Sequence, residues 1–114
     1  QEKENVSIVI ENNSDIEFIS MVIRLYQEGD LTSSQGGANA NESNIEKGEA
    51  LRFKYYEQDI NLEGKASMEV FLVDSNGSEK SVNQTHSLQL TKNKEFHYEL
   101  TGDTKENAKI SKIN

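Results

Sequence analysis

The chain has 114 residues, of which 33% are hydrophobic and 28% charged, and it carries a formal net charge of −8 with a pI near 4.7. This length fits one domain, residues 1–114, with a core of its own. The acidic charge disfavours nucleic acid and anionic lipid head groups as partners. The absence of cysteine excludes disulfides, thiolate zinc sites and cysteine nucleophiles.

Residues 1–4 are a polar stub ahead of the first predicted strand. The sequence contains no initiator Met, no signal peptide and no apolar run approaching ~20 residues. Such a stub is what a removed signal peptide or a lipid-modified cysteine would leave. We therefore expect an extracytoplasmic chain, either secreted or held at the membrane by an N-terminal lipid anchor that this sequence lacks.

Apolar residues recur at every second position through most of the chain, beginning with Val6, Ile8 and Ile10. Period two is the signature of half-buried β-strands. In the tail, Asp103 and Glu106 are spaced to cap a short helix, but alternation favours a short final strand. The predicted strands cover residues 5–11, 16–26, 50–57, 66–74, 79–90, 95–101 and part of the tail after Gly102.

The turn residues predict how these strands connect. The Asn-Asn-Ser-Asp cluster at residues 12–15 predicts a hairpin that joins the first two strands. Asn76-Gly77 predicts a second hairpin with a type I′ turn, in which both central residues have positive φ. Residues 27–44 are rich in Gly, Ser and Asn, and Leu31 is their only large apolar residue before Asn44, so this segment is predicted to be a flexible loop.

Short strands at regular spacing, with no helical stretch between them, predict an all-β fold. We expect an antiparallel β-sandwich of immunoglobulin-like architecture with about seven strands, a small barrel being the alternative. The cysteine–tryptophan–cysteine core of antibody domains is missing. The immunoglobulin-like label therefore describes the architecture only.

Three runs carry a resemblance to a known class: VSIVIENNSDIEFI at 6–19, IEKGEALRF at 45–53 and EVFLVDSNG at 69–77. Their strand–turn order resembles that of small exported or lipid-anchored β-sandwich proteins of Gram-positive bacteria. The resemblance implies an extracytoplasmic, non-enzymatic accessory role.

The residues that commonly carry chemistry do not form a pattern here. His86 shares the parity of the apolar residues that follow it and is expected to point inward or to lie at a sheet edge, whereas His97 is expected to point outward. A zinc site needs three or four convergent ligands, which these two histidines do not supply. No nucleophile elbow and no phosphate-binding glycine loop is present. Residues 74–79 resemble part of a calcium loop, but Glu79 follows the glycine too closely.

We therefore predict no catalytic residue, no metal site and no cofactor, and we expect that the protein is not an enzyme. Paired carboxylates such as Glu57 with Asp59 fit a solvated surface, because acid–base work would require that they face a shared cleft.

Three predicted strands carry apolar residues on both faces, although a sandwich strand should be polar on its solvent side. The second face is either covered by the chain itself, through the loop around Leu31 or through Ile110 and Ile113, or it is a protein–protein or self-association surface, or it is a groove for a small ligand. The residues predicted to form this binding surface are Phe18, Val22, Tyr26, Tyr56, Phe71 and Val73.

The sequence thus favours a non-enzymatic extracytoplasmic binding or interaction module, a domain of a surface lipoprotein. The alternative is a structural accessory subunit of a cell-envelope assembly. The expected partner is another protein or a second copy, with no nucleic acid and with membrane contact only through the N-terminal lipid anchor.

Overall fold

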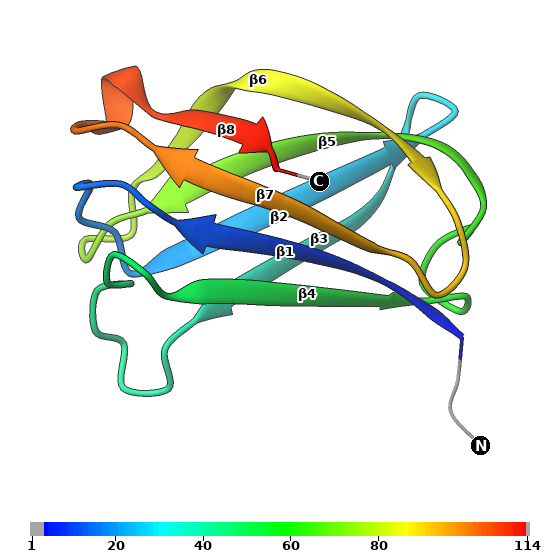
Figure 1. Ribbon diagram of the computed structural model, residues 1–114, viewed down its shortest axis with the longest axis horizontal. Coiled ribbons are helices and arrows are strands. Elements are labelled where there is room, and N and C mark those ends of the chain that lie inside the picture. Colours follow the sequence, from blue (N-terminus) through cyan, green and yellow to red (C-terminus); the bar gives the residue numbers. More distant parts are fainter. Residues whose placement is uncertain (1–3, 114) are drawn as a thin grey trace.

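The computed structural model describes residues 4–113, apart from the side chain of Asn83. Two four-stranded sheets, in the orders β4-β1-β7-β8 and β3-β2-β5-β6, pack as a sandwich (Figure 1). The elements are β1 (Asn5–Asn12), β2 (Ser20–Gln27), β3 (Asp30–Ala38), β4 (Ala50–Tyr56), β5 (Gly64–Val73), β6 (Glu79–Leu90), β7 (Glu95–Thr101), the 3₁₀ helix η1 (Lys105–Asn107) and β8 (Lys109–Lys112).

The predicted all-β sandwich of immunoglobulin-like architecture is confirmed, with eight strands in place of about seven. All strand pairs are antiparallel except β1–β7, which is parallel. Within residues 4–113, no helix has the length and apolar character to cross a membrane.

The predicted hairpin between the first two strands is wrong, because β1 and β2 belong to different sheets. The reason lies in the buried side chain of Asn12. Its Nδ2 donates to the Ile45 carbonyl at 2.9 Å, and its Oδ1 accepts from the Ser14 hydroxyl at 2.6 Å. These bonds make the Asn–Ser cluster a corner that carries the chain across the sandwich instead of reversing it within one sheet.

The flexible loop predicted at 27–44 is wrong for residues 30–38, which form β3 and pair antiparallel with β2. A two-residue turn connects the two strands. Glu28 and Gly29 have φ values of 53° and 84° between the paired residues Gln27 and Asp30, the geometry of a type I′ turn. Strand pairing here overrides the weak strand propensity of Gly and Ser.

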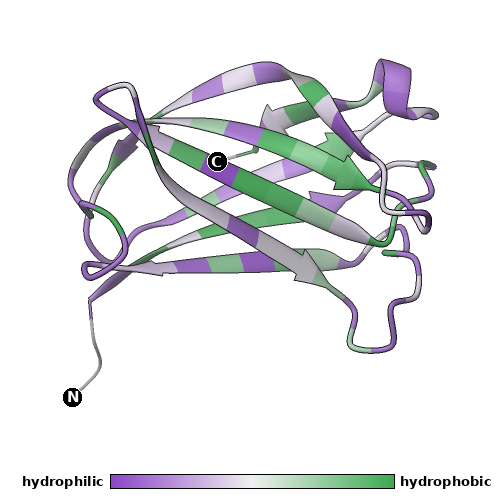
Figure 2. Ribbon diagram, turned by 180° about the vertical axis from the view of Figure 1, so that it is seen from behind, coloured by the Kyte–Doolittle hydropathy of each residue, from purple (hydrophilic) through white to green (hydrophobic). Residues whose placement is uncertain are grey.

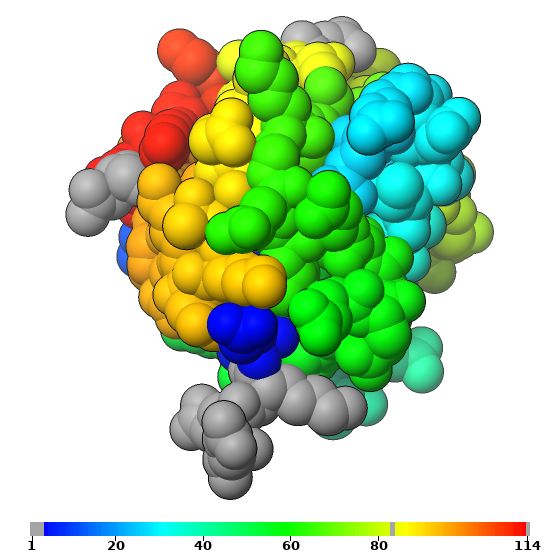
Figure 3. Space-filling view, turned by 90° about the vertical axis from the view of Figure 1, so that its right-hand side faces the viewer, coloured from blue at the N-terminus to red at the C-terminus, as the bar shows by residue number. Residues whose placement is uncertain are grey.

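The β2–β3 turn is held against the connection between β4 and β5. The side-chain amide of Gln27 donates to the Asn61 carbonyl at 2.7 Å and accepts from the Asn61 N–H at 3.2 Å. Figure 3 shows the turn in cyan beside the green connection at this end of the molecule. The Gln27 side chain therefore fixes the end of β2 to the connection between β4 and β5.

The hairpin at Asn76-Gly77 is confirmed as the link between β5 and β6, but its turn is not type I′. Gly77 has a φ of 87° and donates its N–H to the Asp74 carbonyl at 2.8 Å, whereas Asn76 has no positive φ. This is the pattern of a type I turn followed by a left-handed glycine. The type I′ prediction failed because Asn-Gly fits both turns.

The tail forms the predicted final strand, β8, after η1. The helix cap is Thr104 with Asn107, one residue beyond the predicted pair Asp103 and Glu106. β8 also contacts the other sheet, because the Gln84 side chain accepts the Ile110 N–H at 2.9 Å. Gln84 lies where the register of β6 shifts against β5. Its hydrogen bond to β8 therefore links the two sheets at this irregularity.

The core fills the space between the two sheets. As predicted, every second residue in most of the strands contributes its side chain to it. Green bands alternate with purple along the strands in Figure 2, the view from behind. Burial raises the pKa of Tyr55 and raises that of Tyr98 to about 12, since both phenols are held away from water. The Tyr55 hydroxyl has no hydrogen-bond partner among the described residues.

Candidate functional site

Four of the six predicted binding residues lie together on the solvent side of the sheet β3-β2-β5-β6. Val22 and Tyr26 come from β2, and Phe71 and Val73 come from β5. The register sets Val22 opposite Phe71, and Ser20 opposite Val73. We call this surface the β2–β5 face; its residues are Ser20, Val22, Arg24, Tyr26, Ser67, Glu69, Phe71 and Val73.

The other two predicted residues lie elsewhere, so a single patch of six is wrong. Phe18 is fully buried in the core. It precedes β2, and strand parity does not extend to a segment that is still crossing between the sheets. Tyr56 is on β4, opposite Asn5, and therefore belongs to the other sheet.

None of the segments expected to cover this face does so. Ile110 is buried in the core, and Ile113, which is 45% exposed, donates its N–H to the His97 carbonyl on the other sheet. Leu31 is 53% exposed on β3, opposite Tyr26. Leu31 thus extends the β2–β5 face at one end instead of shielding it.

Arg24 shields the apolar centre of the face in part. Its guanidinium carbon lies 4.4 Å from the centroid of the Phe71 ring, and its Nη2 lies 3.4 Å from a Glu79 carboxylate oxygen. The Tyr26 hydroxyl donates to Glu69 at 2.8 Å, and this bond is the main reason that the pKa of Tyr26 is raised. One ion pair and one hydrogen bond to a carboxylate therefore border the apolar residues, while Val22 and Phe71 remain half-buried.

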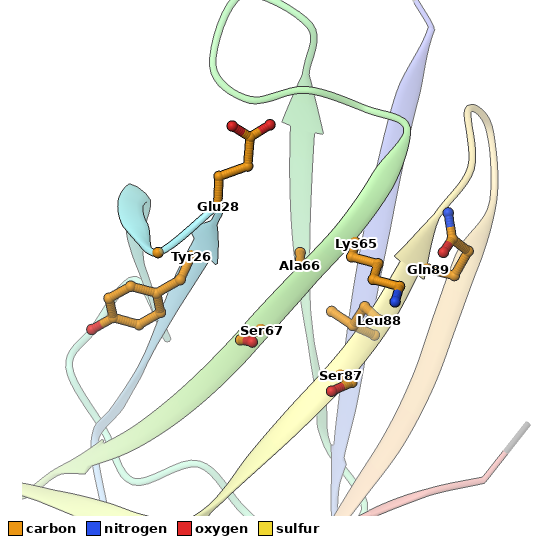
Figure 4. Close-up of a pocket in the computed structure, with 9 residues that line it drawn as sticks. Tyr26, Glu28, Lys65, Ala66, Ser67, Ser87, Leu88 and Gln89 are labelled. Carbon is orange, nitrogen blue, oxygen red and sulfur yellow. The ribbon is translucent and has the colours of Figure 1, made fainter.

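An open trough of about 470 Å³ adjoins the face at its Tyr26 end. Ser67 and Ser87, paired across β5 and β6, form its floor because their side chains are small. In Figure 4, Tyr26 and Glu28 stand on one side of this floor, and Lys65 and Gln89 stand on the other. Sequence analysis missed the trough because only strand register brings two unremarkable serines side by side.

A second cluster lies on the outer face of the other sheet. Arg52 on β4 pairs with Glu95 on β7, and His97 Nε2 lies 3.0 Å from the same carboxylate. The bond from Arg52 is the main reason that the pKa of Glu95 is lowered, and His97 adds to the effect. Arg52 and His97 flank Val9 on the inner strand β1, and Val9 is only 9% exposed although it faces outward. The cluster therefore has a structural explanation, since its side chains shield Val9 from water.

One histidine faces the interior of the sandwich and the other faces outward, as strand parity predicted. His86 faces the interior, where its ring meets the Tyr98 ring edge-on at 5.5 Å, and burial lowers its pKa. His97 is on the outer face with Glu95. Within residues 4–113, no group of three or more His, Cys, Asp or Glu side chains is placed to hold a metal ion.

The sequence matches no known protein family and no curated protein. Solved structures with a similar strand arrangement include intermedilysin, as a disulfide-locked mutant with human CD59, at 7% identity and a TM-score of 0.48, covering 95% of this chain and 24% of that chain. Pneumolysin is similar at 8% identity and a TM-score of 0.46, covering 95% of this chain and 23% of that chain. This chain spans about a quarter of either toxin chain.

The T6SS lipoprotein TssJ1 from Pseudomonas aeruginosa is similar at 12% identity and a TM-score of 0.45, covering 99% of this chain and 98% of that chain. At such low identities and TM-scores, these structures assign neither a family nor a function to this chain.

Proposed function

We propose that this chain is a non-enzymatic binding module that contacts a protein partner through the β2–β5 face. The observation that supports the proposal is the cluster of Val22, Phe71 and Val73 on the solvent side of a sheet, with Tyr26 and Leu31 continuing it at one end. An apolar cluster on the outside of a sandwich carries a cost in solvation that contact with a partner removes.

The chemistry of the face fits a protein partner better than a small molecule. Its apolar centre is bordered by the Arg24–Glu79 ion pair and by the Tyr26–Glu69 hydrogen bond. An apolar centre with a polar rim is the usual composition of protein interfaces, in which Tyr and Arg are enriched. The trough beside Tyr26 is open and offers a place for one side chain of the partner.

The proposed location is outside the cytoplasm, either secreted or lipid-anchored to the cell membrane. Its support is the resemblance of the three sequence runs to exported Gram-positive sandwiches. Protection of the chain from a protease added to intact cells, with digestion only after lysis, would contradict this location.

The Val22→Asp variant tests the binding proposal. Val22 is half-buried and its neighbours leave it open to water, so we expect the free energy of unfolding to fall by no more than about 1 kcal/mol. We expect association with the partner to be lost, because a charge then occupies the apolar centre. Urea melts measure the first effect, and site-specific crosslinking from residue 71 in the host cell measures the second.

Ser111→Asp is the matched control, since it adds the same charge to a partly exposed position of the other sheet. It should leave the crosslink intact. A loss of several kcal/mol in Val22→Asp would mean that the chain covers this face itself. A crosslink equally strong in both variants would overturn the proposed interface.

The alternative function, a structural accessory subunit of an envelope assembly, uses the same face differently. It predicts that Val22→Asp leaves the chain folded but removes it from a large envelope complex, as sedimentation of detergent extracts would detect. A binding module would instead lose one separate partner while no assembly dissolves.

A further inference from the structure

The four edges of the two sheets are not equally protected against pairing with another strand. The edge strands are β4, β8, β3 and β6. β4 carries Arg52 and Lys54, and β8 begins and ends with lysine. β6 carries Glu79 and Lys80, and its register shifts near its middle. Charged side chains and bulges are the common means by which edge strands avoid a further neighbour.

β3 lacks this protection over most of its length. From Leu31 to Ala38 it has no charged residue, and its register shift lies near its start, opposite Leu25 and Tyr26. From Ser33 to Ala38 it pairs with β2 without interruption, while no strand is hydrogen-bonded to the backbone on its other side, where β4 of the other sheet lies nearby. Figure 2 shows β3 at the front of the view, leading into the 39–49 connection.

The side chains of β3 offer little steric hindrance to a neighbour. The regular stretch reads Ser-Ser-Gln-Gly-Gly-Ala, and the one long side chain, Gln35, is occupied because its Nε2 donates to the Lys54 carbonyl at 3.1 Å. The backbone N–H and C=O groups that point away from β2 are therefore available to another strand.

We propose that β3 pairs antiparallel with β3 of a second copy of this chain, so that two four-stranded sheets join into one continuous sheet. Antiparallel pairing sets the acidic start of β3, at Glu28 and Asp30, against the uncharged residues that follow Ala38 in the other copy. Parallel pairing would set these carboxylates against their own copies. The uncharged stretch is self-complementary, because no register within it brings like charges together.

The pairing goes beyond the proposed binding function and uses different atoms. It would place both copies of the β2–β5 face on the same side of the joint sheet, and a partner could then be bound by two faces at once.

Net charge gives the pairing a distinctive salt dependence. Each copy carries −8, so the two copies repel each other at long range, although residues 31–38 of β3 are uncharged. Salt screens this repulsion. We therefore expect dimerisation in sedimentation equilibrium to strengthen as the salt concentration rises.

The Ser34→Lys variant separates the edge from net charge. It makes the net charge of −8 per chain one unit less negative, which would favour association if long-range repulsion alone were decisive. It also places a lysine on the regular part of β3 in both copies. In the dimer the two β3 strands are paired, so the two cations lie close together and repel each other. We expect dimerisation to weaken by about tenfold. Thr85→Lys, the control, makes the same change on β6 at the opposite edge of the sheet and should not weaken it.

A spectroscopic measurement supports the assignment if Ser34→Lys folds poorly. The chain has no cysteine, so Ser34→Cys and Thr85→Cys can each carry a single nitroxide label. Dipolar broadening between copies is expected for the label at 34 and not for the label at 85. A monomer at all protein and salt concentrations, a dimer unaffected by Ser34→Lys, or broadening only at position 85 would each overturn the proposal. The Val22→Asp result is independent of all three outcomes.

Discussion

Two adjacent glycines in β3 have different reasons for being small. A Cβ at Gly37 would lie 3.1 Å from Cζ of Phe53, which is buried in the core, whereas at Gly36 the nearest atoms would be 3.9 Å away. Neither residue has a positive φ. Of the two glycines, it is therefore Gly37 that allows β3 to approach β4 closely.

We expect Gly37→Ala to lower the free energy of unfolding by about 1–3 kcal/mol, because the added methyl group overpacks the Phe53 ring. Gly36→Ala is the control and should leave the free energy unchanged or raise it slightly, since the unfolded chain loses freedom. Urea melts of both variants measure the difference. Equal effects would mean that Phe53 moves aside without cost.

At the scale of elements, β3 depends on the turn before it. Glu28 has a φ of 53° in the type I′ turn, a left-handed conformation that Asn and Gly adopt more readily than Glu. We expect Glu28→Asn to raise the free energy of unfolding by about 0.5–1 kcal/mol. Thermal and urea melts provide the measurement.

Glu28→Ala is the comparison for this turn. It removes the same charge but keeps a residue that disfavours the left-handed region, so it should not stabilise the protein. If both variants stabilise the chain equally, the gain comes from charge and not from the backbone.

Strand parity predicted the elements that bury one face in the core. The bounds of β1, β4, β5, β6 and β7 were predicted to within two residues, because apolar alternation and burial coincide there. β3 could not be predicted from its own residues, since Ser and Gly supply neither alternation nor propensity. Glu28-Gly29 was the available signal, and it is weak because Glu is uncommon in type I′ turns.

Parity was less reliable for the candidate site. It placed Val22, Tyr26, Phe71 and Val73 correctly on one face, because β2 and β5 pair without a register shift. It failed for Phe18, which lies in a crossing segment, and for Tyr56, whose sheet cannot be known from sequence. The sheet to which a strand belongs is decided by long-range pairing, which local periodicity does not encode.

At the scale of the whole molecule, His86 makes stability depend on pH. It lies between the sheets against Tyr98, and burial lowers its pKa below the usual 6.5. The unfolded chain therefore binds a proton more readily than the folded one. The stabilisation is complete above the unfolded pKa and is lost as the pH falls through 6.5 towards the lower folded value.

We expect the free energy of unfolding to decline between about pH 7 and about pH 5, and His86→Gln to flatten this decline. Glu95 has a lowered pKa as well, but its contribution is lost only below its usual 4.5, in a separate range. Urea melts at several pH values measure both. A decline that persists unchanged in His86→Gln but disappears in His97→Gln would contradict the assignment.

The parallel pair β1–β7 has a consequence for how the chain is made. β1 is synthesised first, yet it lies inside its sheet, with β4 on one side and β7 on the other, and Ile8 is in register with Phe96. A nascent chain that ends before β7 leaves one edge of β1 open, with its apolar face incompletely covered. Such topology makes folding slow, because the pairing of β1 cannot be completed until β7 has left the ribosome. Until β7 arrives, the open edge of β1 is a site at which another strand, from the same chain or a different one, can pair wrongly.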